Sequence, residues 1–416
     1  MILKLALRQI KAYKQRTIIT VLLTLFATYM FVFISGLTNG THQIMIDSAV
    51  KLYPGFIKVI NREFDETPSF DNIIFDQEAT RAQIDSAEGV KLSAARFETF
   101  ALYSTDTQTI GGMFTGIEPE KEGDISKLKE SLVEGEYLTS EDTNALYIGS
   151  ELAKRLKVKV GDKLSFISTG ADFSFAADNV YIKGIFKTGL FSFNNAAAFM
   201  NKKYFDMIMA SENIATSFVV EPTSDKDRDI TTTTANIQTK LSNELVAQDY
   251  MTFMDDLIDA MEVDSIFGYF QIAIFFVVIF FVIAIYNFLN AYGRIREFGV
   301  LKAIGTSPAQ IRKLLFAEIF ILATIGVGIG GYAGAETVKY LNTNPLNVTD
   351  IVGESMDMEE YSKQYDLVMV DKYPAEYDLQ DIAWQIAIMY IMTILTIFYP
   401  IFMINRYKPV EAIHHV

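Results

Sequence analysis

Residues 266–289 read IFGYFQIAIFFVVIFFVIAIYNFL, a run of 24 residues without a charged side chain. An α-helix needs about 20 apolar residues to cross the hydrocarbon core of a bilayer, so this stretch can form a transmembrane helix. Residues 18–37 and 382–404 form two further uncharged windows of sufficient length, and a shorter window covers 319–335. The apolar residues 314–317 extend the short window to 314–335. A buried core helix could explain one window but not four, so we predict four membrane spans.

The first window, residues 18–37, follows a basic segment, as the apolar region of a signal peptide would. Its apolar run is about twice the usual length for a signal peptide. It also ends without a clear small-x-small cleavage site. We therefore expect this segment to be retained as a membrane span.

The composition of the 416-residue chain excludes several protein classes. Half of the residues are hydrophobic, which excludes intrinsic disorder. The absence of cysteine excludes a disulfide-stapled scaffold, a zinc finger and thiol catalysis. The chain has 51 acidic and 36 basic residues, a net charge of −15, and this acidity argues against a nucleic-acid binder.

The charges are sorted between the segments that the spans separate. Segments 1–17, 290–313 and 405–416 carry net charges of +5, +4 and +1, whereas segments 38–265 and 336–381 carry −16 and −8. The positive-inside rule assigns the basic segments to the cytoplasm. We therefore expect both termini inside, and a large domain and a shorter acidic loop outside.

The outer segment, residues 38–265, is predicted to form a mixed α+β domain. Its strands are predicted from alternating or β-branched residues, and its helices from apolar residues at helical spacing. The expected strands are 55–60, 163–167 and 180–186, and the expected helices are 149–156 and 233–244, with a polar loop at 223–229. The fold class is thus four transmembrane helices plus a large extracytoplasmic α+β domain.

No catalytic or metal site is visible in this outer domain. The chain has three histidines, His42, His414 and His415, and the first is best explained as an interfacial surface residue. The acidic residues lack the spacing of a calcium loop. A solvated acidic surface is the simpler interpretation, and binding of basic peptides remains an alternative.

The basic connector, residues 290–313, contains a predicted amphipathic helix over 294–304. One face carries apolar residues, and charged residues lie elsewhere. The apolar face consists of Ile295, Phe298, Leu301 and Ile304, and the charged residues are Arg294, Arg296, Glu297 and Lys302.

The end of this helix and the start of the next are marked by capping residues. Gly305 is predicted to end the first helix as a C′ glycine. Ser307 and Gln310 then form a capping box around Pro308 at the first helical position. The pattern leaves two interpretations open: a helix lying at the lipid interface, or a rigid helix that docks into a cytoplasmic partner and transmits force.

The connector also resembles a known family. Residues 294–311 read RIREFGVLKAIGTSPAQI, with Glu318 following, and this is similar to the signature of the FtsX/MacB/LolC–LolE permeases. Thr306 stands where alanine is commoner in that family. Further similar segments are 5–8, 116–120, 134–136, 148–153, 160–162, 184–189 and 407–412, of which 184–189 (GIFKTG) resembles LolC/LolE-type members.

The resemblance implies a permease half of an ABC transporter with a MacB-like periplasmic domain, working by mechanotransmission as a lever rather than a channel. Two permease subunits, identical or different, would pair with two ATPase subunits. Residues 294–305 would be the coupling helix seated in the ATPase. Phe298, Leu301 and Ile304 would fill its groove, Gly305 would end the helix, and Arg294, Arg296, Glu297 and Lys302 would surround the contact.

The chain has no G-x-x-x-x-G-K-S/T phosphate-binding motif. We therefore expect a non-catalytic subunit that binds no cofactor directly and depends on ATP held by the partner ATPase.

The resemblance favours lipoprotein release from the bacterial inner membrane to a periplasmic carrier, as in LolC/LolE-like members. MacB-like efflux of peptides or antibiotics through an outer-membrane partner is the main alternative. FtsX-like activation of cell-wall hydrolases is disfavoured because the outer domain is too large. A membrane sensor without a transport partner also remains open, whereas an enzyme has no supporting constellation.

The third span carries small residues at a regular spacing. Gly326, Gly330 and Gly334 repeat every four residues, which allows close helix approach in lipid. Packing against span two or span four and packing against a second subunit are both consistent with this spacing. Glu318 resembles an acidic residue of the family, and a carboxylate at headgroup level is the alternative interpretation.

Overall fold

The computed structural model describes residues 2–66, 69–347, 360 and 372–406. Two compact units share the chain: Met1–Ile44, Met261–Ile351 and Lys372–Val416 belong to the helical unit, and Met45–Ala260 to the other. The predicted tail at 407–416 and the predicted acidic loop over 348–359 and 361–371 lie outside the described residues. The fold class predicted from the sequence is confirmed, because the described residues hold four membrane-length apolar helices and a large α+β domain.

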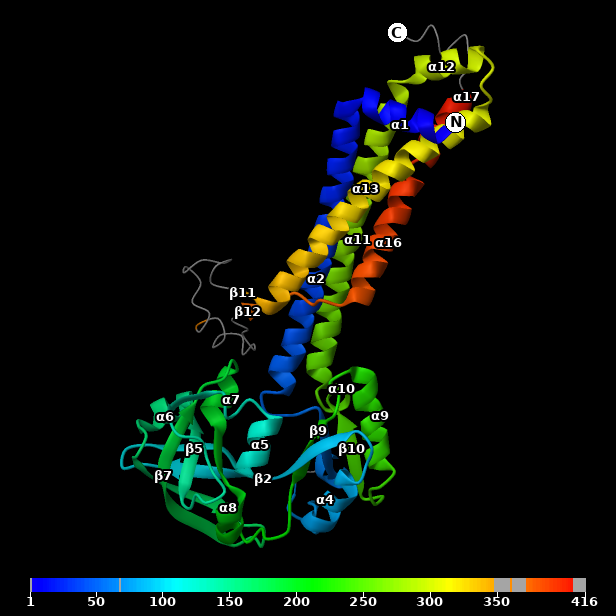
Figure 1. The fold of residues 1–416 in the computed structure, drawn as a ribbon. Coiled ribbons are helices and arrows are strands. Elements are labelled where there is room, and N and C mark those ends of the chain that lie inside the picture. Colours follow the sequence, from blue (N-terminus) through cyan, green and yellow to red (C-terminus); the bar gives the residue numbers. More distant parts are fainter. Residues whose placement is uncertain (1, 67–68, 348–359, 361–371, 407–416) are drawn as a thin grey trace. The chain divides into compact units, whose positions relative to one another are not determined.

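The membrane-length helices are longer than the predicted spans (Figure 1). They are α2 (Lys14–Val50), α11 (Asp255–Tyr292), α13 (Pro308–Thr343) and the helical pair α16 (Leu379–Leu395) and α17 (Phe398–Arg406). The predicted windows end at polar residues, but the helices continue where apolar residues keep helical spacing. In α13, Val338 and Leu341 are buried, so residues 336–343 are helical and not part of a loop.

The fourth candidate span, Leu379–Met403, covers nearly the same residues as the predicted 382–404, but it is built from two helices in succession. The chain turns at Thr396–Ile397, between α16 and α17. Pro400 has no backbone N–H, and its ring collides with the carbonyl four residues earlier, at Thr396. A single continuous helix is therefore disfavoured at this point.

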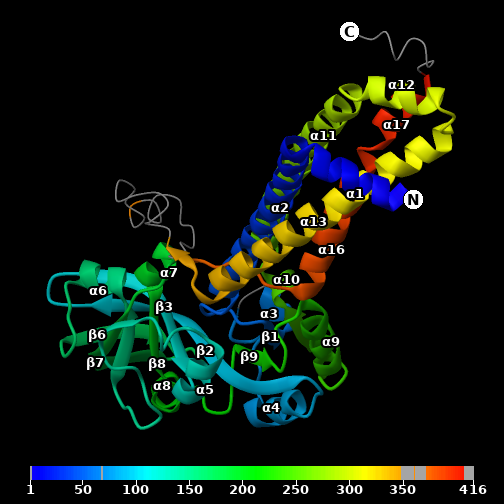
Figure 2. The same ribbon diagram turned by 45° about the horizontal axis from the view of Figure 1, so that its top comes forward.

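Two short helices lie at the basic end of the helical unit. The amphipathic α1 (Ile2–Ala12) lies against α13 in both views (Figures 1 and 2), and Ala6 is its buried residue. The connector helix α12 (Ile295–Ala303) joins α11 to α13. At the other end, β11 (Leu346–Asn347) and β12 (Lys372–Tyr373) pair antiparallel.

The second unit is built around one sheet of ten strands. Its strands are β1 (Ile57–Asn61), β2 (Val90–Ser104), β3 (Thr109–Ile117), β4 (Leu132–Gly135), β5 (Ala145–Gly149), β6 (Lys163–Thr169), β7 (Phe175–Phe186), β8 (Ala197–Asn201), β9 (Ser217–Pro222) and β10 (Leu245–Asp249). Its helices are α3 (Arg62–Glu66), α4 (Gln77–Asp85), α5 (Pro119–Ile125), α6 (Ser150–Leu156), α7 (Phe191–Ala196), α8 (Lys202–Met209), α9 (Asp227–Gln238) and α10 (Tyr250–Phe253).

Six of these strands close into a ring, in the order β2-β3-β8-β5-β7-β6 and back to β2. Closure pairs both edges of every strand and so protects the sheet from edge-to-edge association. Inward-facing aromatic residues fill the interior, among them Phe97, Phe114 and Phe166. The ring is therefore a packed barrel with its own core.

The other part of the sheet has the antiparallel order β10-β1-β9-β2. Along the chain its elements run β1, α4, β2, β9, α9 and β10, a split β-α-β arrangement. Ile84 of α4 and Ile230 and Ile237 of α9 pack into its core. The long strand β2 serves both parts, pairing β9 through residues 90–96 and the barrel through residues 97–104.

The predicted elements of this domain overlap observed elements of the same type, with one larger shift. Strands β1, β6 and β7 and helix α6 fall where strands and a helix were expected. The predicted helix 233–244 instead runs as α9 from Asp227 to Gln238, so part of the predicted loop 223–229 is helical. Asp227 and Asp229 favour the positive end of the helix dipole, which explains the earlier start.

Candidate functional site

The connector helix α12 is bounded by residues whose chemistry fixes its ends. Arg294 is its N-cap residue, and Gly305 has a φ of +96°, which a residue with a side chain rarely adopts. Ser307 accepts a hydrogen bond from the backbone N–H of Gln310, whose side chain accepts one from the N–H of Ser307. The structure thus has a capping box at the start of α13, and the turn between the helices is defined on both sides.

The buried face of α12 packs against its own chain. Ile295 and Phe298 are buried, and Phe298 belongs to a cluster with Ile311 and Leu315 of α13. Leu301 is half-buried and packs against the same cluster. This corrects the prediction that Phe298 fills a partner's groove, since α13 already covers its ring.

Arg294 is also held inside the chain, at 4% exposure. Its Nη1 donates to both carboxylate oxygens of Glu318, at 2.9 and 2.7 Å, and its Nε lies 3.3 Å from Glu297. The hydroxyl of Tyr13 donates to Glu297, which raises the pKa of that tyrosine. Arg294 is therefore not available to a partner, contrary to the prediction, and it ties α12 to α13 and to the N-terminal segment.

The same contacts give Glu318 a role within the chain. Its carboxylate is the ion-pair partner of Arg294, so it does not face lipid headgroups alone. Sequence reasoning singled out both residues but did not pair them. A pattern of charges along one chain does not show which carboxylate lies beside which guanidinium.

The outer face of α12 remains exposed. Ile304 is 74% exposed and Val300 is exposed to nearly half. Arg296 is exposed on the same helix, whereas Lys302 is half-buried and burial lowers its pKa. The free surface thus consists of Arg296, Val300 and Ile304, of which Val300 was not predicted as a contact.

The glycines of α13 pack against α2, whereas the prediction named span two, span four or a second subunit as the alternatives. A Cβ added at Gly326 would overlap Thr24, and one at Gly330 would overlap the carbonyl of Leu25. At Gly334 it would lie 3.0 Å from Cβ of Val32. The glycine stripe is therefore occupied within the chain.

The outer domain contains buried polar contacts that sequence reasoning missed. The guanidinium of Arg96, on β2, donates to Glu122 at 2.9 and 2.6 Å and to the carbonyl of Tyr53 at 2.7 Å. Arg96 also lies 3.8 Å from the centre of the Tyr53 ring. These contacts lie where β2 passes from one part of the sheet to the other.

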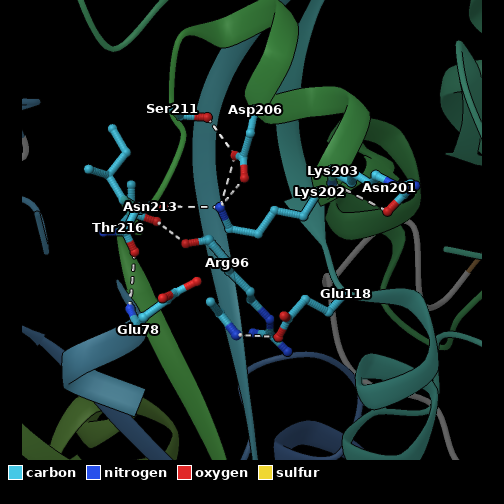
Figure 3. Close-up of polar contacts among 12 residues, drawn as sticks. Glu78, Arg96, Glu118, Asn201, Lys202, Lys203, Asp206, Ser211, Asn213 and Thr216 are labelled. Atoms are coloured by element: carbon cyan, nitrogen blue, oxygen red, sulfur yellow. Dashed lines mark hydrogen bonds and ion pairs between the residues drawn. The ribbon is translucent and has the colours of Figure 1, made fainter. Parts of the chain in front are cut away.

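Lys202 forms a second group of buried polar contacts (Figure 3). Its Nζ lies 2.8 Å from both carboxylate oxygens of Asp206 and 3.0 Å from the carbonyl of Ile214. Burial lowers the pKa of Lys202 and raises that of Asp206. The lysine is satisfied by structural partners, so the group stabilises the fold and offers no reactive amine.

Among the described residues, no three or more His, Cys, Asp or Glu side chains lie close enough together to hold a metal ion. The tail histidines, His414 and His415, lie outside the described residues, as does the side chain of His42.

The candidate site lies in a part of the chain that matches a known protein family. Residues 269–409, about a third of the chain, match the family model described as FtsX-like permease C-terminal. The match includes α12, α13 and their polar network. No curated protein matches the chain.

Three solved structures are similar to this chain at low identity. The extracellular domain of the noncanonic ABC-type transporter YknZ from Gram-positive bacteria aligns at 15% identity and a TM-score of 0.34, over 46% of this chain and 99% of that one. The periplasmic region of MacB from Actinobacillus actinomycetemcomitans aligns at 9% identity and a TM-score of 0.37, and the alignment covers 53% of this chain and 98% of that one. A domain of a permease protein from Porphyromonas gingivalis aligns at 12% identity and a TM-score of 0.29, and the alignment covers 46% of this chain and 87% of that one. These scores establish no shared activity or partner.

Proposed function

We propose that this chain, whose residues 269–409 match the FtsX-like permease model, is the transmembrane subunit of an ABC transporter driven by a separate ATPase. In this proposal α12 transmits force between the ATPase and the spans. The ATPase binds ATP, and the chain itself performs no chemistry. A second permease subunit, identical or different, completes the transporter.

The observation that carries the proposal is the construction of α12. A force-transmitting helix must move as one body with the span that follows it, and it must present a free surface to the partner. Phe298 and the Arg294–Glu318 ion pair join α12 to α13, and Gly305 and Ser307 define the turn between them. The exposed residues Val300 and Ile304 supply the free surface.

The finer proposal is lipoprotein release from the bacterial inner membrane, with a periplasmic carrier as acceptor and both termini in the cytoplasm. The similarity of residues 184–189 to LolC/LolE-type members supports the substrate, and the basic charge of segments 1–17 and 290–313 supports the orientation. MacB-like efflux predicts a trapped peptide or antibiotic in the purified transporter in place of a lipoprotein.

The test uses Ile304→Glu, because the side chain of Ile304 is exposed and its replacement leaves the core of α12 intact. The full-length chain is affinity-purified from its native membranes in mild detergent, and bound proteins are identified by mass spectrometry. We expect a stoichiometric ATPase carrying a G-x-x-x-x-G-K-S/T motif. In the Ile304→Glu variant, the introduced carboxylate would be buried in the groove of the ATPase. This should reduce the amount of recovered ATPase about tenfold or more.

Val263→Glu is the matched control, since Val263 is an exposed valine of α11 far from α12 in the chain. This variant should retain the ATPase. Failure of the unmodified chain to recover any such ATPase, or equal recovery with Ile304→Glu, would contradict the proposal.

A further inference from the structure

A small cavity with both polar and apolar lining residues lies at the basic end of the helical unit. Its volume is about 40 Å³, room for about three waters or one phosphate group. Its lining includes Tyr13 before α2, Arg16 of α2, Asn290 of α11, Arg294 at the N-cap of α12, Glu318 of α13 and Pro400 of α17. The cavity therefore lies near one surface of the bilayer.

Two guanidinium groups meet at this cavity with donors to spare. Arg294 is almost fully buried, and its Nη2 has no hydrogen-bond partner among the described residues. The buried Nη1 of Arg16 also lacks an acceptor there. Both guanidinium carbons lie 5.4 Å from the centre of the Tyr13 ring, so this ring holds the two cations together. Buried donors of this kind are normally paired.

Two cations, Arg16 and Arg294, and one carboxylate, Glu318, line the cavity, a net charge of +1. Glu318 accepts two hydrogen bonds from Nη1 of Arg294, and Glu297 accepts from Nε of Arg294 and from Tyr13. Both carboxylates are thus engaged. In the described part of the chain, no carboxylate forms an ion pair with Arg16, and Glu297 is not part of the lining. The two arginines of the lining thus keep two buried N–H donors without an acceptor.

We propose that this cavity binds the phosphate group of an anionic phospholipid, with Arg16 and Arg294 as its ligands. Nη2 of Arg294 and Nη1 of Arg16 supply charge-assisted hydrogen bonds to the phosphate oxygens. The half-buried residues Tyr13, Arg16 and Thr17 give a headgroup access from the side of α2. Basic pockets between spans on the cytoplasmic side are suited to such headgroups. A bound lipid would connect α2 to the Arg294 network that positions α12.

Native mass spectrometry of the full-length chain in detergent, titrated with phosphatidylglycerol, tests this site. We expect one tightly retained lipid. Arg16→Gln should weaken its binding about tenfold, the effect of losing one charge-assisted hydrogen bond. Arg16→Lys should restore part of it. The Arg16 side chain has no ion pair among the described residues, so its replacement should leave the fold intact.

Arg8→Gln is the matched control, because Arg8 is exposed on α1 and does not line the cavity. It should bind phosphatidylglycerol like the unmodified chain. Equal weakening in both variants, or no retained lipid, would overturn the proposal. Displacement of the lipid by millimolar inorganic phosphate would retain the phosphate chemistry and overturn the lipid as its source. Persistent binding in the presence of inorganic phosphate supports the lipid.

Discussion

Two buried arginines of the described residues, Arg96 in the outer domain and Arg294 in the helical unit, have similar partners but different surroundings. Each is nearly inaccessible, pairs with a glutamate through two hydrogen bonds and lies near a tyrosine ring. Arg96 has no buried nitrogen without a partner, and its glutamate, Glu122, is completely buried. Arg294 has an unpaired Nη2 beside a cavity, and its glutamate is partly exposed.

The unpaired donor of Arg294 distinguishes the two ion pairs: the Arg96–Glu122 pair is structural, whereas the Arg294–Glu318 pair can also take part in function. A fully satisfied pair rigidifies the place where it lies, whereas an unpaired buried donor is costly and needs an acceptor. The Arg96 pair holds the long strand β2 where the two parts of the sheet meet. The Arg294 network joins two helices and leaves one donor for a ligand.

The largest expected effect is that of Arg96→Ala. It leaves Glu122 buried without its cation, which typically costs about 3–5 kcal/mol. Hydrogen exchange of the full-length chain should show faster exchange in β2 and β9. Arg155→Ala, at an exposed arginine of α6, should stay within about 0.5 kcal/mol. Equal protection of the β2 and β9 amides in both variants would contradict a structural role of the Arg96–Glu122 pair.

Glu318→Gln should have a smaller effect, about 1–3 kcal/mol in the local opening of α12. The loss is limited because Glu297 still faces Arg294 and because Glu318 is partly exposed. Hydrogen exchange in residues 295–303 measures it, with Glu262→Gln as an exposed control. The double variant Arg294→Met/Glu318→Leu removes both charges and should exchange more slowly than Glu318→Gln. Equally fast exchange in the two variants would show that the unpaired charge of Arg294 does not cause the faster opening of α12.

Gly330→Ala tests whether α2 seats the helix that carries the Arg294 network. The added methyl would overlap the carbonyl of Leu25, and overpacking of this kind costs about 1–3 kcal/mol. Gly328→Ala is the matched control, because no atom lies within 4 Å of its added Cβ. The melting temperature in detergent should fall for Gly330→Ala alone. Alanine favours a helix more than glycine does, so helix propensity alone would not lower the melting temperature of either variant. A similar fall for both variants would therefore contradict contact with α2 as the cause.

The smallest expected effect belongs to Ser307→Ala, about 1 kcal/mol. It removes the side-chain oxygen that accepts from the N–H of Gln310 at the start of α13. Exchange of the first amides of α13 reports the loss. Thr306→Ala is the control, and a change of the same size there would contradict the capping role.

Local features of this chain could be predicted from its sequence, and long-range pairings could not. The spans at 18–37 and 266–289 follow from uncharged length, and the connector helix and its capping box follow from residues within a few positions of each other. The break in the fourth span was missed although Pro400 signals it. The inward position of Phe298 was missed because its spacing marks an apolar face without naming the surface that covers it.

The sequence by itself determined which segments are apolar helices, where the connector helix begins and ends, and on which side the basic charge gathers. Each of these depends on the chemistry of neighbouring residues. The tertiary structure decided that the glycine stripe faces α2, that six strands close into a barrel, and that Tyr13 contacts Glu297, 284 residues away. Such contacts depend on how distant segments pack, because helical spacing defines a face but not its partner.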